Sequence, residues 1–320
     1  VESADFRLPI FSADYSKEYT ITKMYGTFTS AESKKLRTVY LPNTIDALSS
    51  QAFDSNDQIE TVGLPTNLVA ISGYCFRNAT KLKTLLPASV LTSGQITNWN
   101  TSAFNGASAV TNEINLETTQ TIGASAFSNA KLLRYKGDGT LWLTNAVNVG
   151  DSAFNGVTNV FRVQLAEGTI KSFGFYGCSS LTNVTPFLPH SVTSVSKFGV
   201  YLKTTPLSGT LRLSNPEITT IPASIISFTQ VGEVDLRGTS ISAWTANTFW
   251  SAGSLSNVWL NSGFTFPKVD ALFNGDSLRR IYFSGDASSP DREQFYNATK
   301  MTFLLPRWNT TWTDLLADTT

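Results

Sequence analysis

The feature that most constrains the fold is a phenylalanine that returns at nearly constant spacing, usually after a small residue. The clearest copies are Ala52-Phe53, Cys75-Phe76, Ala103-Phe104, Ala126-Phe127 and Ala153-Phe154. Two intervals, Phe53 to Phe76 and Phe104 to Phe127, are 23 residues long, while the two intervals between Phe76 and Phe104 and between Phe127 and Phe154 are 28 and 27 residues. A fixed period in the low twenties is typical of a solenoid, in which each turn stacks on the one before.

The apolar residues between these phenylalanines predict one short strand in every turn. An aliphatic residue follows six positions after the phenylalanine, as at Ile59 and Leu82, and another comes three positions later, as at Val62 and Leu85. In the regular turns a further aliphatic residue, such as Leu64, stands two residues after that one. The two residues alternate along the strand, so one face of the strand is apolar. A Leu-Pro pair such as Leu64-Pro65 then ends the strand, because proline has no backbone donor for the sheet.

No single turn can bury this apolar set alone, so the turns must stack into an array. We predict a β-rich solenoid, a right-handed coil with a parallel concave sheet and an irregular or short-helical convex side. Residues 1–35 are expected to form an N-terminal cap of short strands, residues 36–305 an array of about twelve turns, and residues 306–320 a C-terminal cap. Because an array grows in one dimension, the whole chain is predicted to be a single structural domain.

The string L-P-x-x-(V/L)-x-x-I-x-x-x-A-F-x-x-x-x-x-L-x-x-V resembles the repeat of bacterial surface leucine-rich-repeat proteins typified by the adhesin BspA. The resemblance covers roughly Leu36 to Leu305, with departures around Leu211-Arg212-Leu213 and Val234-Asp235-Leu236. It implies a leucine-rich-repeat fold, and it implies adhesion to host or bacterial surface proteins or to extracellular matrix.

Charge and cysteine content set limits on partners and compartment. Lysine plus arginine equals aspartate plus glutamate at 24 each, so we expect neither nucleic acid nor an anionic membrane as partner. The chain has no apolar run long enough to span a membrane, so any anchor is expected in a missing N-terminal segment. Cys75 and Cys178 lie four turns apart and are predicted to be buried thiols rather than a disulfide.

Sequence motifs for catalysis or cofactor binding are missing. The single histidine, His190, follows a Leu-Pro turn without a partner motif, and two cysteines cannot complete a zinc site. The segment Lys136-Gly137-Asp138-Gly139 resembles half of a calcium loop but has no alternating ligand set. We therefore predict a protein that is not an enzyme, with no cofactor and no metal.

Residues on either side of the inward aliphatic position should point out onto the concave sheet. Two groups of candidate ligand-binding residues follow from this rule. A basic group in the middle turns consists of Arg134, Lys136, Arg162 and Arg212. A mixed group towards the C-terminus consists of Asp235, Trp259, Arg280 and Tyr282. Tryptophan, tyrosine and arginine are enriched at binding hot spots, and aromatic faces also suit sugar rings.

These observations leave three functions open. The first is a secreted or surface-anchored bacterial binding protein, located outside the cell, that holds a host, bacterial or matrix protein on the concave face. The second is a glycan-binding component of a polysaccharide-capture system, which would use Trp259 and Tyr282. The third is a structural spacer that lifts another domain from the cell and binds neither ligand.

Overall fold

The computed structural model describes residues 3–7, 10–11, 17–24, 27–31, 33–146, 148–165, 169–170, 174–185, 208–213, 216–221, 226, 229–244, 246–266, 277–285 and 302–304. The chain divides into two compact units, Val1–Ser180 and Leu181–Thr320, and each is described by itself. The predictions made for His190 and for the C-terminal cap, residues 306–320, lie outside the described residues.

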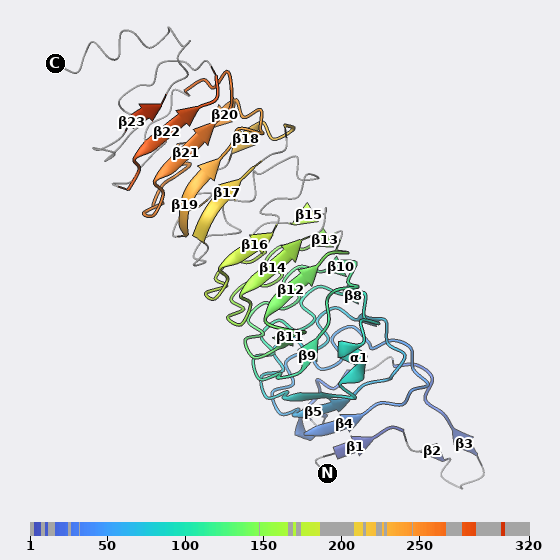
Figure 1. The fold of residues 1–320 in the computed structure, drawn as a ribbon. Coiled ribbons are helices and arrows are strands. Elements are labelled where there is room, and N and C mark those ends of the chain that lie inside the picture. Colours follow the sequence, from blue (N-terminus) through green and yellow to red (C-terminus); the bar gives the residue numbers. More distant parts are fainter. Residues whose placement is uncertain are drawn as a thin grey trace, which may run out of the picture. The chain divides into compact units, whose positions relative to one another are not determined.

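The first unit is built mainly from short strands that pair in parallel (Figure 1). One sheet has the order β1 (Ser3–Asp5), β4 (Thr38–Tyr40), β5 (Thr61–Gly63) and β7 (Thr84–Leu86). Farther along the chain, β9 (Glu113–Ile114) pairs with β11 (Arg134–Tyr135), and β12 (Thr140–Leu143) pairs with β14 (Arg162–Leu165). The inward residues of these strands, among them Val39, Val62, Leu85 and Val163, are buried, as the apolar spacing predicts.

The recurring phenylalanines form one stacked column through the core of this unit. Its rings are Phe28, Phe53, Phe76, Phe104, Phe127, Phe154 and Phe175, and neighbouring centroids lie 4.8 to 6.0 Å apart. The five phenylalanines that define the sequence repeat have no exposed surface. Phe28 extends the column into residues 1–35, where the sequence analysis recognised no turn.

Backbone hydrogen bonds hold successive phenylalanines one turn apart. The amide of Phe53 donates to the carbonyl of Cys75, 2.8 Å away, and the amide of Phe76 donates to Ala103 at the same distance. The residues two before and two after the phenylalanine have positive φ, as at Ser102 (53°) and Gly106 (73°) around Phe104. This left-handed conformation favours glycine, asparagine and small polar residues, which explains the composition of these turns.

A second parallel sheet lies on the other side of the first unit (Figure 1). Its two-residue strands follow the order β6 (Ala70–Ile71), β8 (Asn98–Trp99), β10 (Thr121–Ile122), β13 (Asn148–Val149) and β15 (Thr169–Ile170). Helix in the described residues is limited to α1 (Ser89–Thr92) and the 3-10 turn η1 (Ser33–Lys35). The convex side is therefore built mainly from turns and short strands, with little of the expected short helix. The antiparallel pair β2 (Ile10–Phe11) and β3 (Glu18–Tyr19) precedes these turns.

The second unit begins with β16 (Asn183–Thr185) and contains a longer parallel sheet. Its order is β17 (Ser208–Arg212), β19 (Gln230–Asp235), β21 (Asn257–Leu260), β22 (Arg280–Phe283) and β23 (Thr302–Leu304). A smaller pair joins β18 (Thr220–Ile221) to β20 (Ala243–Trp244). Val234, Val258 and Ile281 are buried beneath the sheet, and Trp244 and Phe264 belong to a cluster of aromatic rings in the same unit.

The predicted fold class is confirmed, because parallel strands stack into a β-solenoid around the repeated apolar residues. The predicted division into an N-terminal cap, an array of about twelve turns and a C-terminal cap within one domain stays a prediction.

Candidate functional site

The outward face of the second unit's long sheet presents two rows of side chains, set by the register of its parallel strands. The first row runs Thr210, Glu233, Asn257, Arg280 and Thr302. The second row, which we call the aromatic row, runs Arg212, Asp235, Trp259, Tyr282 and Leu304. The structure therefore brings together five of the eight predicted site residues: Arg212, Asp235, Trp259, Arg280 and Tyr282.

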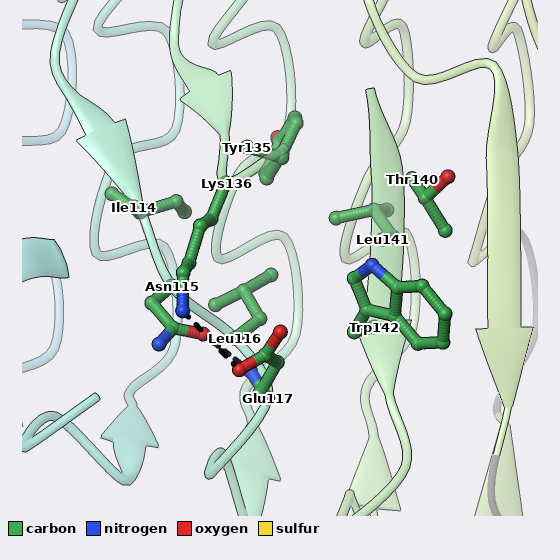
Figure 2. Close-up of a pocket in the computed structure, with 9 residues that line it drawn as sticks. All are labelled: Ile114, Asn115, Leu116, Glu117, Tyr135, Lys136, Thr140, Leu141 and Trp142. Carbon is green, nitrogen blue, oxygen red and sulfur yellow. Dashed lines mark hydrogen bonds and ion pairs between the residues drawn. The ribbon is translucent and has the colours of Figure 1, made fainter. Parts of the chain in front are cut away.

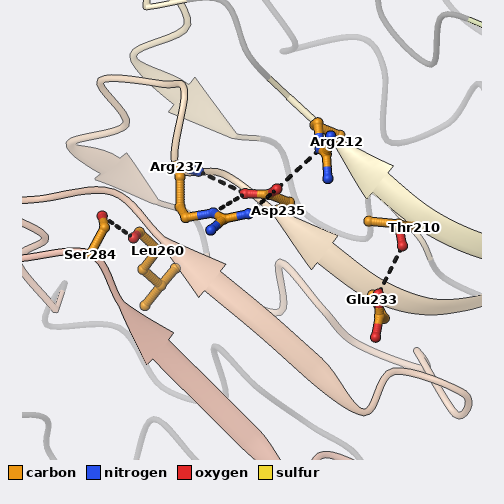
Figure 3. Close-up of polar contacts among 7 residues, drawn as sticks. All are labelled: Thr210, Arg212, Glu233, Asp235, Arg237, Leu260 and Ser284. Atoms are coloured by element: carbon orange, nitrogen blue, oxygen red, sulfur yellow. Dashed lines mark hydrogen bonds and ion pairs between the residues drawn. The ribbon is translucent and has the colours of Figure 1, made fainter. Parts of the chain in front are cut away.

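Asp235 anchors the aromatic row through two arginines (Figure 3). The guanidinium of Arg237 donates two hydrogen bonds to its carboxylate, at 2.9 and 2.8 Å, and Nε of Arg212 donates a third at 3.1 Å. The Asp235 side chain is only 6% exposed, while those of Arg212 and Arg237 are 67% and 49% exposed. The hydrogen bond from Arg237 lowers the pKa of Asp235, so the carboxylate stays charged and fixes both cations at the surface.

Trp259 and Tyr282 form a stacked pair on adjacent strands. Their ring centroids are 4.8 Å apart and their planes differ by 7°. The guanidinium carbon of Arg237 lies 5.8 Å from the Trp259 ring centroid, and Leu304 is the register neighbour of Tyr282 on its other side. One face of each ring is thus covered by the other ring, which leaves less ring face for a ligand than two separate rings would.

The other row is polar and partly unpaired. Glu233 accepts hydrogen bonds from the Thr210 hydroxyl at 2.9 Å and from the Asn257 amide at 3.0 Å (Figure 3 shows the first). Arg280 is exposed beside Tyr282, and in the part of the chain that the structure describes its guanidinium has no ion-pair partner. An arginine without a partner anion is available to a carboxylate on another molecule.

The basic group predicted for the middle turns has members in both units. Arg134 lies on β11 and its guanidinium donates to the carbonyl of Thr111 at 3.1 Å. Lys136 lies in the turn after β11 and faces Glu117 at 3.5 Å. Arg162 pairs in register with Thr140 on β12 and forms a 3.5 Å ion pair with Asp138. Arg212 belongs to the second unit, and residues 136–139 form a turn between β11 and β12 in the first unit. That these four residues bind a ligand stays a prediction.

Sequence reasoning missed Trp142, which lies on the outward face of β12 and is 41% exposed. It lines a small pocket with Lys136, Glu117 and Asn115 (Figure 2). The alternation in Thr140-Leu141-Trp142-Leu143 could have revealed it, because the two leucines are buried and the tryptophan between them must point outward.

The described residues offer no metal centre and no reactive thiol. They contain no group of three or more histidine, cysteine, aspartate or glutamate side chains that could hold a metal ion. Cys75 and Cys178 are free and buried, as expected, and burial raises the pKa of Cys178 to about 12. No helix within the described ranges has the length and apolar character needed to cross a membrane.

Comparison with known families agrees with this architecture. The family model for the BspA-type leucine-rich-repeat region matches in six copies, over residues 22–134, 139–208 and 169–302. The chain belongs to the BspA-type leucine-rich-repeat family. The match begins before residue 36, in agreement with the place of Phe28 in the phenylalanine column.

Solved structures of other leucine-rich-repeat proteins have a similar fold. A leucine-rich repeat protein from Bacteroides ovatus is 17% identical, with a TM-score of 0.69 over 94% of this chain and 73% of its own. A leucine-rich cell surface protein from Faecalibacterium prausnitzii is 15% identical, with a TM-score of 0.54 over 98% and 89% of the two chains. At these identities the likeness concerns the leucine-rich-repeat fold alone. A comparison with curated proteins found no match.

Proposed function

We propose that this BspA-type protein is a non-catalytic binding protein, secreted or held at the bacterial cell surface, that binds a partner protein on the outward face of its second unit. The family supports a role in protein binding, and one structural neighbour is itself described as a cell surface protein. Host, bacterial-surface and matrix proteins are the partners that such a location makes available.

The observation that carries the proposal is the aromatic row with Arg280 beside it. Trp259, Tyr282 and three arginines are residue types that dominate protein interfaces. Asp235 holds Arg212 and Arg237 in place before any partner arrives, so less side-chain entropy is lost on binding. Because Trp259 and Tyr282 cover one face of each other and Arg237 lies near the Trp259 ring, this row favours a protein partner over a stacked sugar.

Biolayer interferometry against immobilised extracellular-matrix, serum and bacterial surface proteins tests this proposal. Arg280→Glu and Trp259→Ala should each lower the affinity for the bound partner about tenfold or more, as expected for residues at an interface hot spot. Arg279→Glu is the matched control, because it makes the same charge change one residue earlier, where the side chain lies outside both rows.

The control should bind like the unaltered chain. Equal loss in Arg279→Glu would point to general electrostatics instead of a defined site. If none of the matrix, serum or bacterial surface proteins binds, the spacer function is favoured and the proposal is wrong.

A further inference from the structure

The break between β11 and β12 in the first unit creates a site different from the aromatic row. Among the described strands, β12 is at one edge of its sheet, so it has a hydrogen-bonded neighbouring strand on one side only. On that side its register partner is Gln164, whose side chain cannot stack as a ring does. In Figure 2 the face of the indole is turned towards the viewer, and Lys136 and Glu117 lie on the other side of the small pocket.

Trp142 differs from Trp259 in the state of its ring faces. Trp259 is stacked on Tyr282 and lies near Arg237, whereas no aromatic ring or guanidinium in the described residues is paired with the indole of Trp142. An unstacked indole face beside polar groups can take up the C–H face of a ligand, which carries partial positive charge.

Two weak ion pairs lie in the region of this indole. Lys136 and Glu117 line its pocket, and Arg162, which pairs with Asp138, lies one register step (two residues) from it, opposite Thr140. Lys136 faces Glu117 at 3.5 Å, and Arg162 faces Asp138 at 3.5 Å, with all four side chains between 46% and 67% exposed. Exposed pairs at this distance contribute little to stability, so a ligand hydroxyl can insert between the partners at low cost. The two cations and two anions balance, and the site therefore has no preference for a charged ligand.

The polar groups at the site also suit hydroxyls. Glu117 and Asp138 supply acceptors, and Lys136 supplies donors beyond the one directed at Glu117. The enclosed part of the pocket is only about 10 Å³, roughly one water, so a ligand must lie on the surface and not inside it.

We infer that Trp142, with the Lys136–Glu117 and Arg162–Asp138 pairs, forms a surface site for a neutral hexopyranose residue of an oligosaccharide. The sugar's C–H face packs on the indole, while its hydroxyls exchange hydrogen bonds with the flanking charged groups. This site does not depend on the protein-binding proposal, since none of its residues belongs to the second unit's rows.

Saturation-transfer NMR with maltohexaose, cellohexaose, mannohexaose and chitohexaose tests the inference, and isothermal titration then gives affinities. At least one of these neutral sugars should bind, and Trp142→Ala should weaken it about tenfold, as expected for losing the ring contact. Trp142→Phe keeps an aromatic face and should lose less. Trp250→Ala is the control, because Trp250 is equally exposed, at 41%.

Folding of each variant is checked by its thermal unfolding midpoint, so that loss of sugar binding is not loss of structure. Absence of binding by all four sugars at about 10 mM, a concentration that detects millimolar affinity, would overturn the inference. Undiminished binding by folded Trp142→Ala would overturn it as well. Arg280→Glu should leave sugar binding unchanged, which separates this result from the fate of the protein-binding proposal.

Discussion

An aspartate, an arginine two residues later and an aromatic ring on the next parallel strand recur in both units of the protein. In the first unit, Arg7 donates to both carboxylate oxygens of Asp5, at 2.8 and 2.6 Å. Its guanidinium carbon lies 4.3 Å from the ring centroid of Tyr40, the register neighbour of Asp5. The second unit repeats the arrangement with Asp235, Arg237 and Trp259.

The two clusters differ in what surrounds them. The Asp5 side chain is 30% exposed on β1, an edge strand, whereas that of Asp235 is 6% exposed on a strand paired on both sides. At the next register position the first unit has Gly63 and the second has Tyr282. The same Asp-x-Arg sequence thus forms an exposed ion pair on an edge strand in the first unit. In the second unit it forms an ion pair whose carboxylate is buried, on a strand in the interior of the sheet.

Among the substitutions that test this comparison, one at Gly63 should change the stability of the protein most. A Cβ atom there would collide with the Tyr40 ring, so Gly63→Val is expected to lower the free energy of unfolding by about 3 kcal/mol through overpacking. Urea denaturation gives the value. Gly253→Val is the control, because nothing lies within 4 Å of a Cβ at that glycine.

Adding Tyr40→Ala to Gly63→Val should restore most of the lost stability, because the ring is the main obstacle. If the cost persists without the ring, then the Tyr40 backbone, 3.2 Å from the added atom, is the real constraint, and the ring does not explain the glycine.

Asp235→Asn should cause the next largest loss in the free energy of unfolding. Loss of a buried carboxylate that accepts three charged hydrogen bonds should cost about 2 kcal/mol, less than a fully buried pair because both arginines can be hydrated. Chemical denaturation at neutral pH measures this cost. A neutral result would mean that the carboxylate only positions the arginines and does not stabilise the sheet.

The pH dependence of this effect has a definite sign. The folded pKa of Asp235 is lowered, so its stabilisation is present above the ordinary aspartate pKa of about 4 and is lost as pH falls through the folded value. The difference in unfolding midpoint between the unaltered chain and Asp235→Asn should therefore shrink on acidification from neutral pH. A constant difference down to the lowest pH would contradict the carboxylate as the cause.

The fold was predictable because every turn repeats the same physical requirement. Phe104 and Val62 must face inward wherever the period places them, and both are fully buried. The candidate site was predictable only where the strands keep register, as for Trp259 and Tyr282. The pairing of Arg237 with Asp235 was not predictable, because it depends on a turn conformation that apolar spacing does not encode.

The stacking of Trp259 on Tyr282 should contribute a smaller interaction energy to stability than Asp235 does. A double-mutant cycle with Trp259→Ala and Tyr282→Ala isolates the ring contact, and we expect an interaction energy of about 1 kcal/mol. Trp259→Ala with Thr302→Ala is a control pair from non-adjacent strands and should be additive. Additivity in the first pair would mean that the stacked geometry adds nothing beyond the burial of each ring.

Asp5→Asn should have the smallest effect, although its contacts with Arg7 are as short as those of Asp235 with Arg237. The pair is exposed at an edge strand, and water and salt screen it. We expect no resolvable change in unfolding midpoint at about 150 mM salt and a slight decrease only at about 10 mM, where the Debye length is longer. Asp235→Asn should remain destabilising at both salt concentrations, because its carboxylate is shielded from solvent. If Asp5→Asn costs as much as Asp235→Asn, then hydrogen-bond geometry, and not burial by neighbouring strands, separates the two clusters.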